Sequence, residues 1–311
     1  MSISKTPDLF GGDVFTSLDQ PDAITSLNVN QEETFRKMTD TYQSSLKNVV
    51  PALMDFVKVN YSDKNKLFSP GAAVSVQMVT DLLARAGLGQ WFQIDPYLLG
   101  AAQTSIDALK DIYPEMMFTP DNLSLQQSIQ QTKSVTDLEF GRVSSAMTRA
   151  VMNELLSMQL IPRPLKAVSA VFAGQQHISK NHASTVLNTA MAMQQRTTSI
   201  AGGKALNKAF PEKERWFFYG GPTGQVGSKR AKGVGVIRPF CSHLVNSAIR
   251  QKDMGKLNNN NKGAQDFSLY GGGYNCRHSL TPVTETWVKV TKTPRVDSKT
   301  IDRANRAAKG G

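Results

Sequence analysis

An abrupt change in sequence pattern at Arg215 constrains the fold of this chain more than any other feature. Before it, apolar residues recur at helical spacing, as they do from Asp137 to Leu160. After it come an aromatic run, Trp216 to Tyr219, and then closely spaced glycines, which are typical of strands and turns. The pattern predicts an α+β protein whose N-terminal two-thirds are mainly helical and precede a small α+β domain.

Prolines, glycines and capping residues divide the helical part into separate predicted helices. We expect helices over about 30–49, 72–86, 96–112, 137–160, 165–173 and 181–198. The pair Gly202-Gly203 is expected to close the last of them. In the small domain, Cys241 to Arg250 is expected as a short helix and Trp287 to Val290 as a strand.

These elements predict four regions along the chain. A helical domain covers residues 1–130, and a helical segment that packs on the C-terminal domain covers 131–210. The small α+β domain covers 211–292. Residues 293–311 form a basic tail, expected to be disordered or helical only on contact with a partner.

Positive charge is concentrated in the last third of the sequence. The whole chain has 36 Lys and Arg against 25 Asp and Glu, a formal net charge of +11. Residues 1–200 contain 16 basic and 18 acidic residues, so residues 201–311 carry +13. Such an asymmetry indicates a polyanionic partner, or a solvated basic surface that keeps the protein soluble.

Five cations of the small domain, with aromatic residues of the run close by, are the candidate nucleic-acid-binding residues: Lys229, Arg230, Lys232, Arg238 and Arg277. Cations alone give salt-sensitive phosphate contacts without sequence preference, whereas nearby aromatic rings could also stack on bases. An alternative role for the two arginines beside the cysteines is to hold the small domain together through backbone carbonyls.

The two cysteines of the chain each belong to a C-x-H pair, Cys241-Ser242-His243 and Cys276-Arg277-His278. On an extended segment, residues two apart point to the same side, so each pair could offer a thiolate and an imidazole. Together, Cys241, His243, Cys276 and His278 predict a Cys₂His₂ set that suits structural zinc. Two alternatives stay open: reduced cysteines with hydrogen-bonded histidines, and a Cys241–Cys276 disulfide, which a reducing cytosol disfavours.

Enzyme activity has little support in the sequence. Between Trp216 and Pro282 the only acidic residues are Asp253 and Asp266, and neither adjoins a C-x-H pair. Hydrolytic zinc sites usually have a nearby carboxylate as general base. The glycines after Tyr219 lack the spacing of a phosphate-binding loop. We therefore expect no enzyme, while a metal-dependent, nuclease-like enzyme built on the Cys/His pairs and a stand-alone nucleic-acid-binding module remain as alternatives.

Three strings together resemble a family of tailed-phage head-morphogenesis proteins, the minor head proteins of the phage Mu F type. The strings are Trp216 to Pro222, Arg238 to Cys241 and Gly271 to His278. In that family an aromatic-Gly-Pro strand precedes an Arg-Pro-x-Cys segment, and an Asn-Cys-Arg-Cys/His motif follows. The resemblance covers about Ile161 to Glu285, with Gln225 to Val236 as an insertion.

The resemblance implies a virion structural protein: a minor head or head-morphogenesis component, oligomeric in the virion head or neck and assembled in the host cytoplasm. Its partners would be the portal or other head and neck proteins, together with packaged DNA. Its cofactors would be none, or structural zinc. No membrane partner is expected, because the sequence has no apolar run of about 18 residues and no visible secretory signal.

Overall fold

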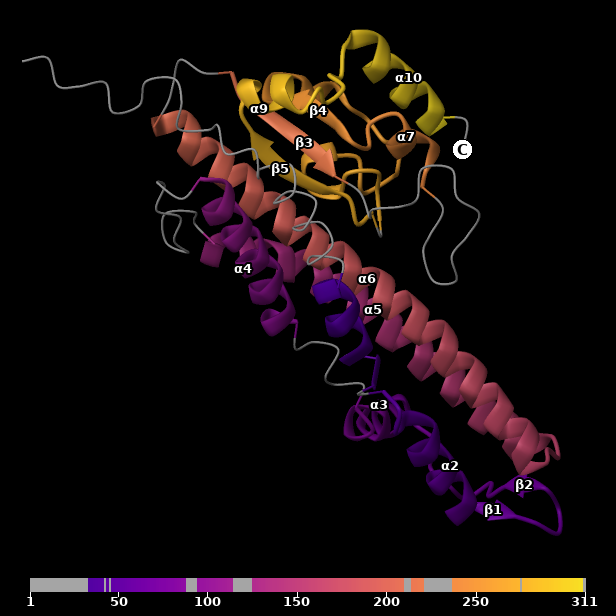
Figure 1. The fold of residues 1–311 in the computed structure, drawn as a ribbon. Helices are drawn as coiled ribbons and strands as arrows, with labels where there is room; N and C mark the ends of the chain where they lie inside the picture. The colour runs from indigo at the N-terminus through magenta and orange to yellow at the C-terminus, as the bar shows by residue number, and fades with distance from the viewer. Residues whose placement is uncertain are drawn as a thin grey trace, which may run out of the picture.

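The computed structural model describes residues 33–41, 43–44, 46–87, 94–113, 125–209, 214–220, 237–274 and 276–309. Over these residues the protein is mostly helical, with two small antiparallel sheets. It forms a long helical rod that carries a small domain at one end (Figure 1). The predicted α+β class is therefore confirmed. None of the helices in the described ranges combines the length and apolar character needed to cross a membrane.

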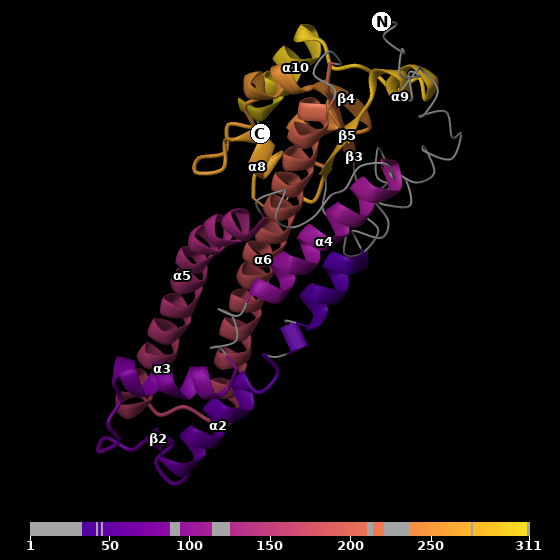
Figure 2. The ribbon, with the colours of Figure 1, turned by 90° about the vertical axis from the view of Figure 1, so that its left-hand side faces the viewer.

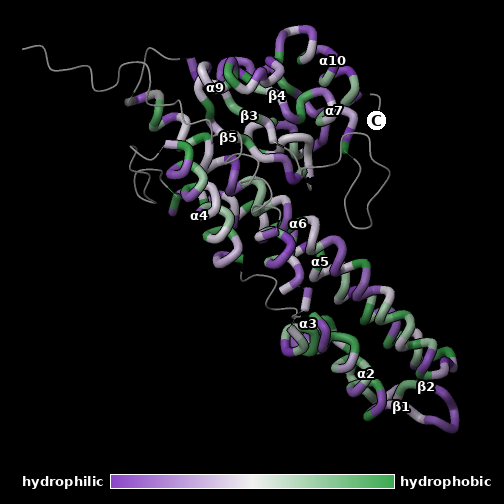
Figure 3. Tube along the Cα trace, viewed as in Figure 1, coloured by the Kyte–Doolittle hydropathy of each residue, from purple (hydrophilic) through white to green (hydrophobic). Residues whose placement is uncertain are grey.

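Two long helices, α5 (Leu125–Leu160) and α6 (Leu165–Ala209), form the rod. Residues 161–164 connect them, and the prolines at 162 and 164 cannot continue a helix. A connection this short makes the two helices antiparallel neighbours. A third helix, α4 (Asp95–Ile112), lies along α6 (Figure 2). Hydrophilic and hydrophobic residues are mixed along all three helices (Figure 3). Most residues of α6 from 183 to 199 are buried, because α4, α5 and the sheet all pack on this part of the helix.

A buried polar layer connects α5 and α6 near the small domain. The Thr132 hydroxyl donates to the Gln194 side-chain oxygen at 3.1 Å, and the Gln194 amide donates to the Ser128 hydroxyl at 2.7 Å. All three side chains are buried. Because buried polar groups are stable only when paired, this layer favours a single register between the two helices.

The far end of the rod is closed by the N-terminal elements. These are α2 (Val49–Val59), the hairpin of β1 (Tyr61–Ser62) and β2 (Leu67–Phe68), and α3 (Val76–Arg85). The α5–α6 turn is held there by the Arg163 backbone N–H, which donates to the Lys66 carbonyl at 2.7 Å. The Arg163 guanidinium also pairs with Glu154 at 2.8 Å.

The small domain is built on a three-stranded antiparallel sheet of order β4-β3-β5. The central strand is the predicted aromatic strand, β3 (Trp216–Gly220), and its neighbours are β4 (Ser247–Arg250) and β5 (Ser279–Val283). Phe217 lies opposite Ile249 on one side and Pro282 on the other. The sheet lies against α6 (Figure 1), so that α6 belongs to both the rod and the small domain.

Short elements surround this sheet: α7 (Pro239–Ser242), the 3₁₀ helix η2 (Gln251–Lys256), α8 (Phe267–Tyr270), α9 (Glu285–Val290) and α10 (Ser298–Lys309). The buried residues form two apolar clusters. One fills the rod and reaches the sheet through Trp216 and Trp287. The other lies inside the small domain and includes Phe217, Cys241 and Cys276.

The prediction of two helices over 165–198 was wrong, because α6 is continuous to Ala209. The pair Gly202-Gly203 does not end the helix. A Cβ at Gly202 would lie 2.5 Å from a Leu109 methyl carbon, and one at Gly203 would lie 2.6 Å from the Phe217 ring. The two glycines therefore allow close packing of α4 and β3 on α6, which offsets their low helix propensity.

Three further predictions about the small domain need correction. Residues 287–290 belong to α9 and not to a strand, because the Thr284 hydroxyl caps this helix by accepting from the Trp287 N–H at 3.0 Å. The expected helix over 241–250 is split, since α7 ends at Ser242 and β4 follows. The basic tail contains an ordered helix, α10, which buries Ile301 and packs on α7.

The predicted boundary between residues 130 and 131 falls inside α5. Residues on both sides of it, such as Ile129 and Phe140, are buried in the same apolar cluster. The two helical regions that we expected as separate units therefore share one core.

Candidate functional site

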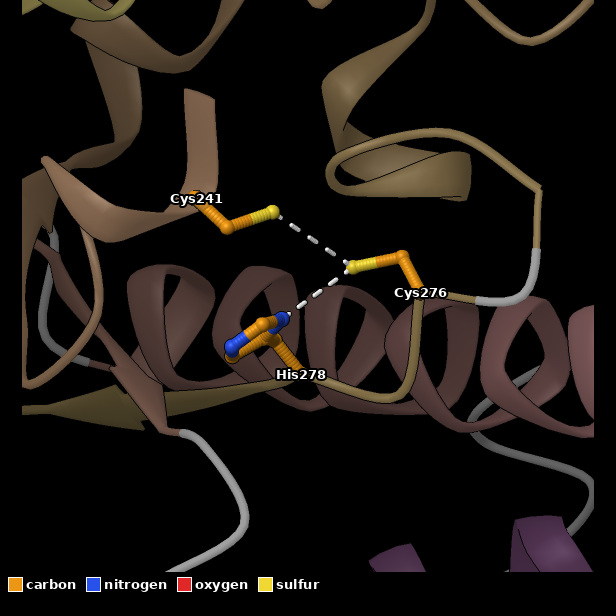
Figure 4. Close-up of side chains that lie close together, drawn as sticks. All are labelled: Cys241, Cys276 and His278. Atoms are coloured by element: carbon orange, nitrogen blue, oxygen red, sulfur yellow. Dashed lines mark hydrogen bonds between the residues drawn. The ribbon is translucent and has the colours of Figure 1, made fainter. Parts of the chain in front are cut away.

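The two cysteines and one histidine converge inside the small domain (Figure 4). The Cys241 sulfur lies 4.0 Å from the Cys276 sulfur, which lies 3.3 Å from Nδ1 of His278. All three side chains are buried, with exposed fractions of 1% for Cys241, 6% for Cys276 and 7% for His278. Of the described residues, only these three form a group of Cys, His, Asp or Glu close enough to hold a metal ion.

Local structure explains why only one C-x-H pair contributes both of its residues. Cys276 and His278 lie in the irregular segment that leads into β5, and their side chains meet on one side, with Sγ and Nδ1 3.3 Å apart. Cys241 instead lies in α7, where residues two apart are about 200° apart around the helix axis. His243 consequently follows α7 as an exposed residue outside the group. The predicted Cys₂His₂ set is therefore incomplete, with three of its four residues together.

Tyr219 of β3 closes another side of the cluster. Its hydroxyl lies 3.5 Å from the Cys241 sulfur and 3.3 Å from the Cys276 sulfur. Its ring stacks on the His278 ring, with centroids 5.0 Å apart. The aromatic strand that the sequence predicted thus supplies a polar group to the cluster, a role that the sequence did not indicate.

The glycine string 271–273 is required by this packing. A Cβ at Gly272 would overlap the Cys241 sulfur, and one at Gly271 would lie 2.9 Å from the Cys276 sulfur. Gly271 also has a φ of +56°, which favours glycine. Any side chain at these two positions would therefore push the sulfurs out of place.

Arg196 of α6 is the functional residue that the sequence reasoning missed. Its guanidinium is buried, with 1% exposure, and donates to the carbonyls of His278 at 3.0 Å, Leu269 at 2.6 Å and Cys276. Arg196 is the only charged residue between Lys180 and Lys204. An isolated cation in such a long uncharged stretch was the signal that could have identified it. A buried charge is costly unless it has partners, so a single cation in a segment expected to be buried indicates specific hydrogen bonds.

Arg238 has the structural role that the sequence left as an alternative to DNA binding. Its guanidinium donates to the carbonyls of Gly272 and Tyr274, and so holds the glycine turn. Arg277 lies half-buried between the two cluster residues Cys276 and His278. The other three candidate nucleic-acid-binding residues, Lys229, Arg230 and Lys232, lie outside the described residues.

The two cysteines have opposite electrostatic environments. The hydrogen bond from Cys241 lowers the pKa of Cys276 well below its usual range, and the nearby His278 and Arg196 act in the same direction. The same hydrogen bond, together with burial, raises the pKa of Cys241. The pair therefore favours a Cys276 thiolate that accepts a hydrogen bond from the Cys241 thiol.

The two acidic residues between Trp216 and Pro282 are engaged away from this cluster. Asp253 is buried and pairs with Arg250 at 2.7 Å and Lys256 at 2.6 Å. Asp266 caps α8 by accepting from the Ser268 N–H at 2.8 Å. The cluster can therefore bind a metal or undergo thiol chemistry, but neither acid is placed to act as its general base.

Comparison of the chain with protein-family models, with curated proteins and with solved structures finds no match.

Proposed function

We propose that this protein is a non-catalytic minor head component of a tailed-phage virion, as its resemblance to the Mu F type implies. The observation that carries the proposal is the convergence of the strings on which the resemblance rests. Described parts of all three, from β3, α7 and the 271–278 segment, meet around the buried Cys241–Cys276 pair. Three strings that are distant in the sequence thus pack around one pair of cysteines, as expected if evolution has maintained them as one structural unit.

The character of the cluster supports a structural role. Its thiols, imidazole and phenol are buried and contact one another, whereas a catalytic group must reach its substrate. The two arginines next to it, Arg196 and Arg238, donate to backbone carbonyls. These are the contacts of residues that hold a domain together.

The helix α10 supplies a surface suited to DNA. One face buries Ile301 and Ala304, and the opposite side exposes Lys299, Arg303 and Arg306 at helical spacing, together with one acid, Asp302. Figure 1 shows α10 at the outer edge of the small domain, away from the rod. We assign contact with packaged DNA to this face, because three aligned cations complement the phosphate backbone.

The far end of the rod supplies a surface suited to a protein partner. Val59 at the end of α2 is 84% exposed, and Leu160 at the end of α5 is 82% exposed. The adjacent Ile161 is also exposed. We assign docking on the portal or another head protein to this end, because exposed apolar side chains are stabilised when a protein interface covers them.

Mass spectrometry of purified procapsids and mature particles tests the proposal. The particles come from the phage that encodes the chain, and peptides of the major capsid protein serve as the reference for copy number. We expect the chain in few copies per particle. Its absence from both procapsids and mature particles would refute the proposal.

A further inference from the structure

The buried cluster contains the donor atoms that zinc prefers. Two sulfurs and one imidazole come from Cys241, Cys276 and His278, and their ligand atoms all lie within 4.8 Å of one another. Thiolate and imidazole ligands together select zinc over hard cations such as magnesium or calcium. The two sulfurs and the imidazole therefore suit a zinc ion in their chemical type and in their proximity to one another.

The spacing of the donors is close to that of a tetrahedral site. Zinc–sulfur bonds of about 2.3 Å and zinc–nitrogen bonds of about 2.0 Å place neighbouring ligands roughly 3.3–3.8 Å apart. The measured separations are 4.0 Å between the two sulfurs and 3.3 Å between the Cys276 sulfur and Nδ1 of His278. The Tyr219 hydroxyl, 3.3 and 3.5 Å from the two sulfurs, is at ligand-to-ligand distance from both of them.

The imidazole of His278 is only partly satisfied by the protein. Nδ1 contacts the Cys276 sulfur, but the buried Nε2 has no hydrogen-bond partner in the described part of the chain. Buried polar atoms in folded proteins are nearly always paired. Nδ1 faces the sulfurs and is the nitrogen that would bind the ion, which leaves the proton on Nε2. The unpaired Nε2 is therefore not explained by zinc, and the proposal rests on the donors that do converge.

The residues around the cluster hold its ligands in place. Arg196 binds the backbone carbonyls of Cys276 and His278, and Arg238 binds the carbonyl of Gly272, next to the Cys241 sulfur. Fixed outer partners of this kind orient metal ligands and reduce the cost of binding. Two thiolates would neutralise a divalent ion, so a bound zinc would add no net charge to this buried site.

We propose that Cys241, Cys276 and His278 bind one structural zinc ion, with the Tyr219 hydroxyl as the fourth donor. The ion would connect α7, β3 and the segment before β5 at the centre of the small domain. This inference does not depend on the proposed function, because a zinc site can exist whether or not the protein belongs to a virion. It replaces His243 of the sequence-based set with Tyr219.

Metal analysis of the full-length chain tests the inference. The protein is expressed with added zinc and purified under reducing conditions without chelator, and its zinc content is measured by mass spectrometry. We expect about one zinc per chain. Cobalt substitution should give the charge-transfer bands of a thiolate-bound ion, and the Cys241→Ser variant should weaken them.

The two histidines of the C-x-H pairs provide a matched control. His243→Ala should keep the zinc, and His278→Ala should lose it. Because His278→Ala could also fail to fold, His278→Cys provides a second test, since a thiolate in place of the imidazole should retain the ion. Tyr219→Phe should weaken zinc affinity, because it removes the fourth donor and leaves the two sulfurs and the imidazole.

Three results would overturn the zinc site. The first is wild-type protein with no more zinc than the Cys276→Ser variant and with two titratable thiols. The second is an intact mass lower by two hydrogens, which would show a Cys241–Cys276 disulfide. The third is loss of zinc on His243→Ala but not on His278→Ala.

Discussion

Replacement of the buried arginine is the sharpest test of how the small domain is held on the rod. Arg196→Met keeps much of the side-chain volume but removes three hydrogen bonds to the carbonyls of Cys276, His278 and Leu269. Each such bond from a charged donor contributes about 1.5–3 kcal/mol. Relief of the buried charge, which costs several kcal/mol, offsets part of this sum. We expect a net loss of about 3–5 kcal/mol in the free energy of unfolding.

Urea unfolding followed by tryptophan fluorescence measures this loss, because Trp216 and Trp287 both lie at the sheet that packs on α6. A destabilisation of this size lowers the midpoint by about 1–2 M urea if the slope is unchanged. Arg196→Lys should recover little stability, since a single ammonium cannot span three carbonyls as the planar guanidinium does.

An exposed arginine on the rod provides the control. Among the residues that the structure describes, Arg149 bonds only the Ser145 carbonyl, at 3.3 Å in its own helix, and Arg149→Met should change stability by less than about 0.5 kcal/mol. A loss below about 1 kcal/mol for Arg196→Met, or full stability with lysine, would show that the three carbonyl contacts do not hold the domain.

Three further outcomes are expected. Gly272→Ala should destabilise the protein by about 1–3 kcal/mol, since its Cβ would overlap the Cys241 sulfur, while Gly174→Ala, in an open part of α6, should stabilise by about 0.5–1 kcal/mol in thermal unfolding. Asp253→Asn should cost about 1–3 kcal/mol at pH 7. Hydrogen bonds from Lys256 and Arg250 lower the pKa of Asp253, so in unfolding measured from pH 7 to 3 the difference should shrink as the pH falls below about 4. In DNA-binding titrations against salt, glutamine at the three α10 cations should reduce the slope of log affinity by about 2–3, while the same change at three rod cations should not. The α10 set is Lys299, Arg303 and Arg306, and the rod set is Lys64, Arg149 and Lys166.

The sequence predicted the helices best where local signals and packing agree. The helix over 96–112 is α4, with its proline in the first turn, and the aromatic run is β3. The end of α6 could not be predicted, because Gly202 and Gly203 are tolerated only through packing against Leu109 and Phe217. That packing brings together residues far apart in the chain, which a local pattern does not contain.

The candidate site was also predicted only in part, because residue spacing alone does not give the local backbone structure or the long-range contacts. The spacing of Cys276 and His278 was sufficient because their side chains do meet on one side of the segment before β5. The same C-x-H spacing gave a wrong prediction for His243, because α7, a helix of only four residues, turns that side chain away from Cys241. Arg196 was missed since its partners are backbone carbonyls, which carry no sequence signature.

The continuity of α6 fixes a length as well as a fold. From Leu165 at the turn to Arg196 beneath the cysteines the helix runs without a break, and 31 residues at 1.5 Å each span about 46 Å. A partner bound at the far end of the rod is therefore held at a fixed distance from a partner bound to the small domain. The helix would set the distance between two neighbours, and inserting or deleting matched whole turns in both α5 and α6 would change that distance.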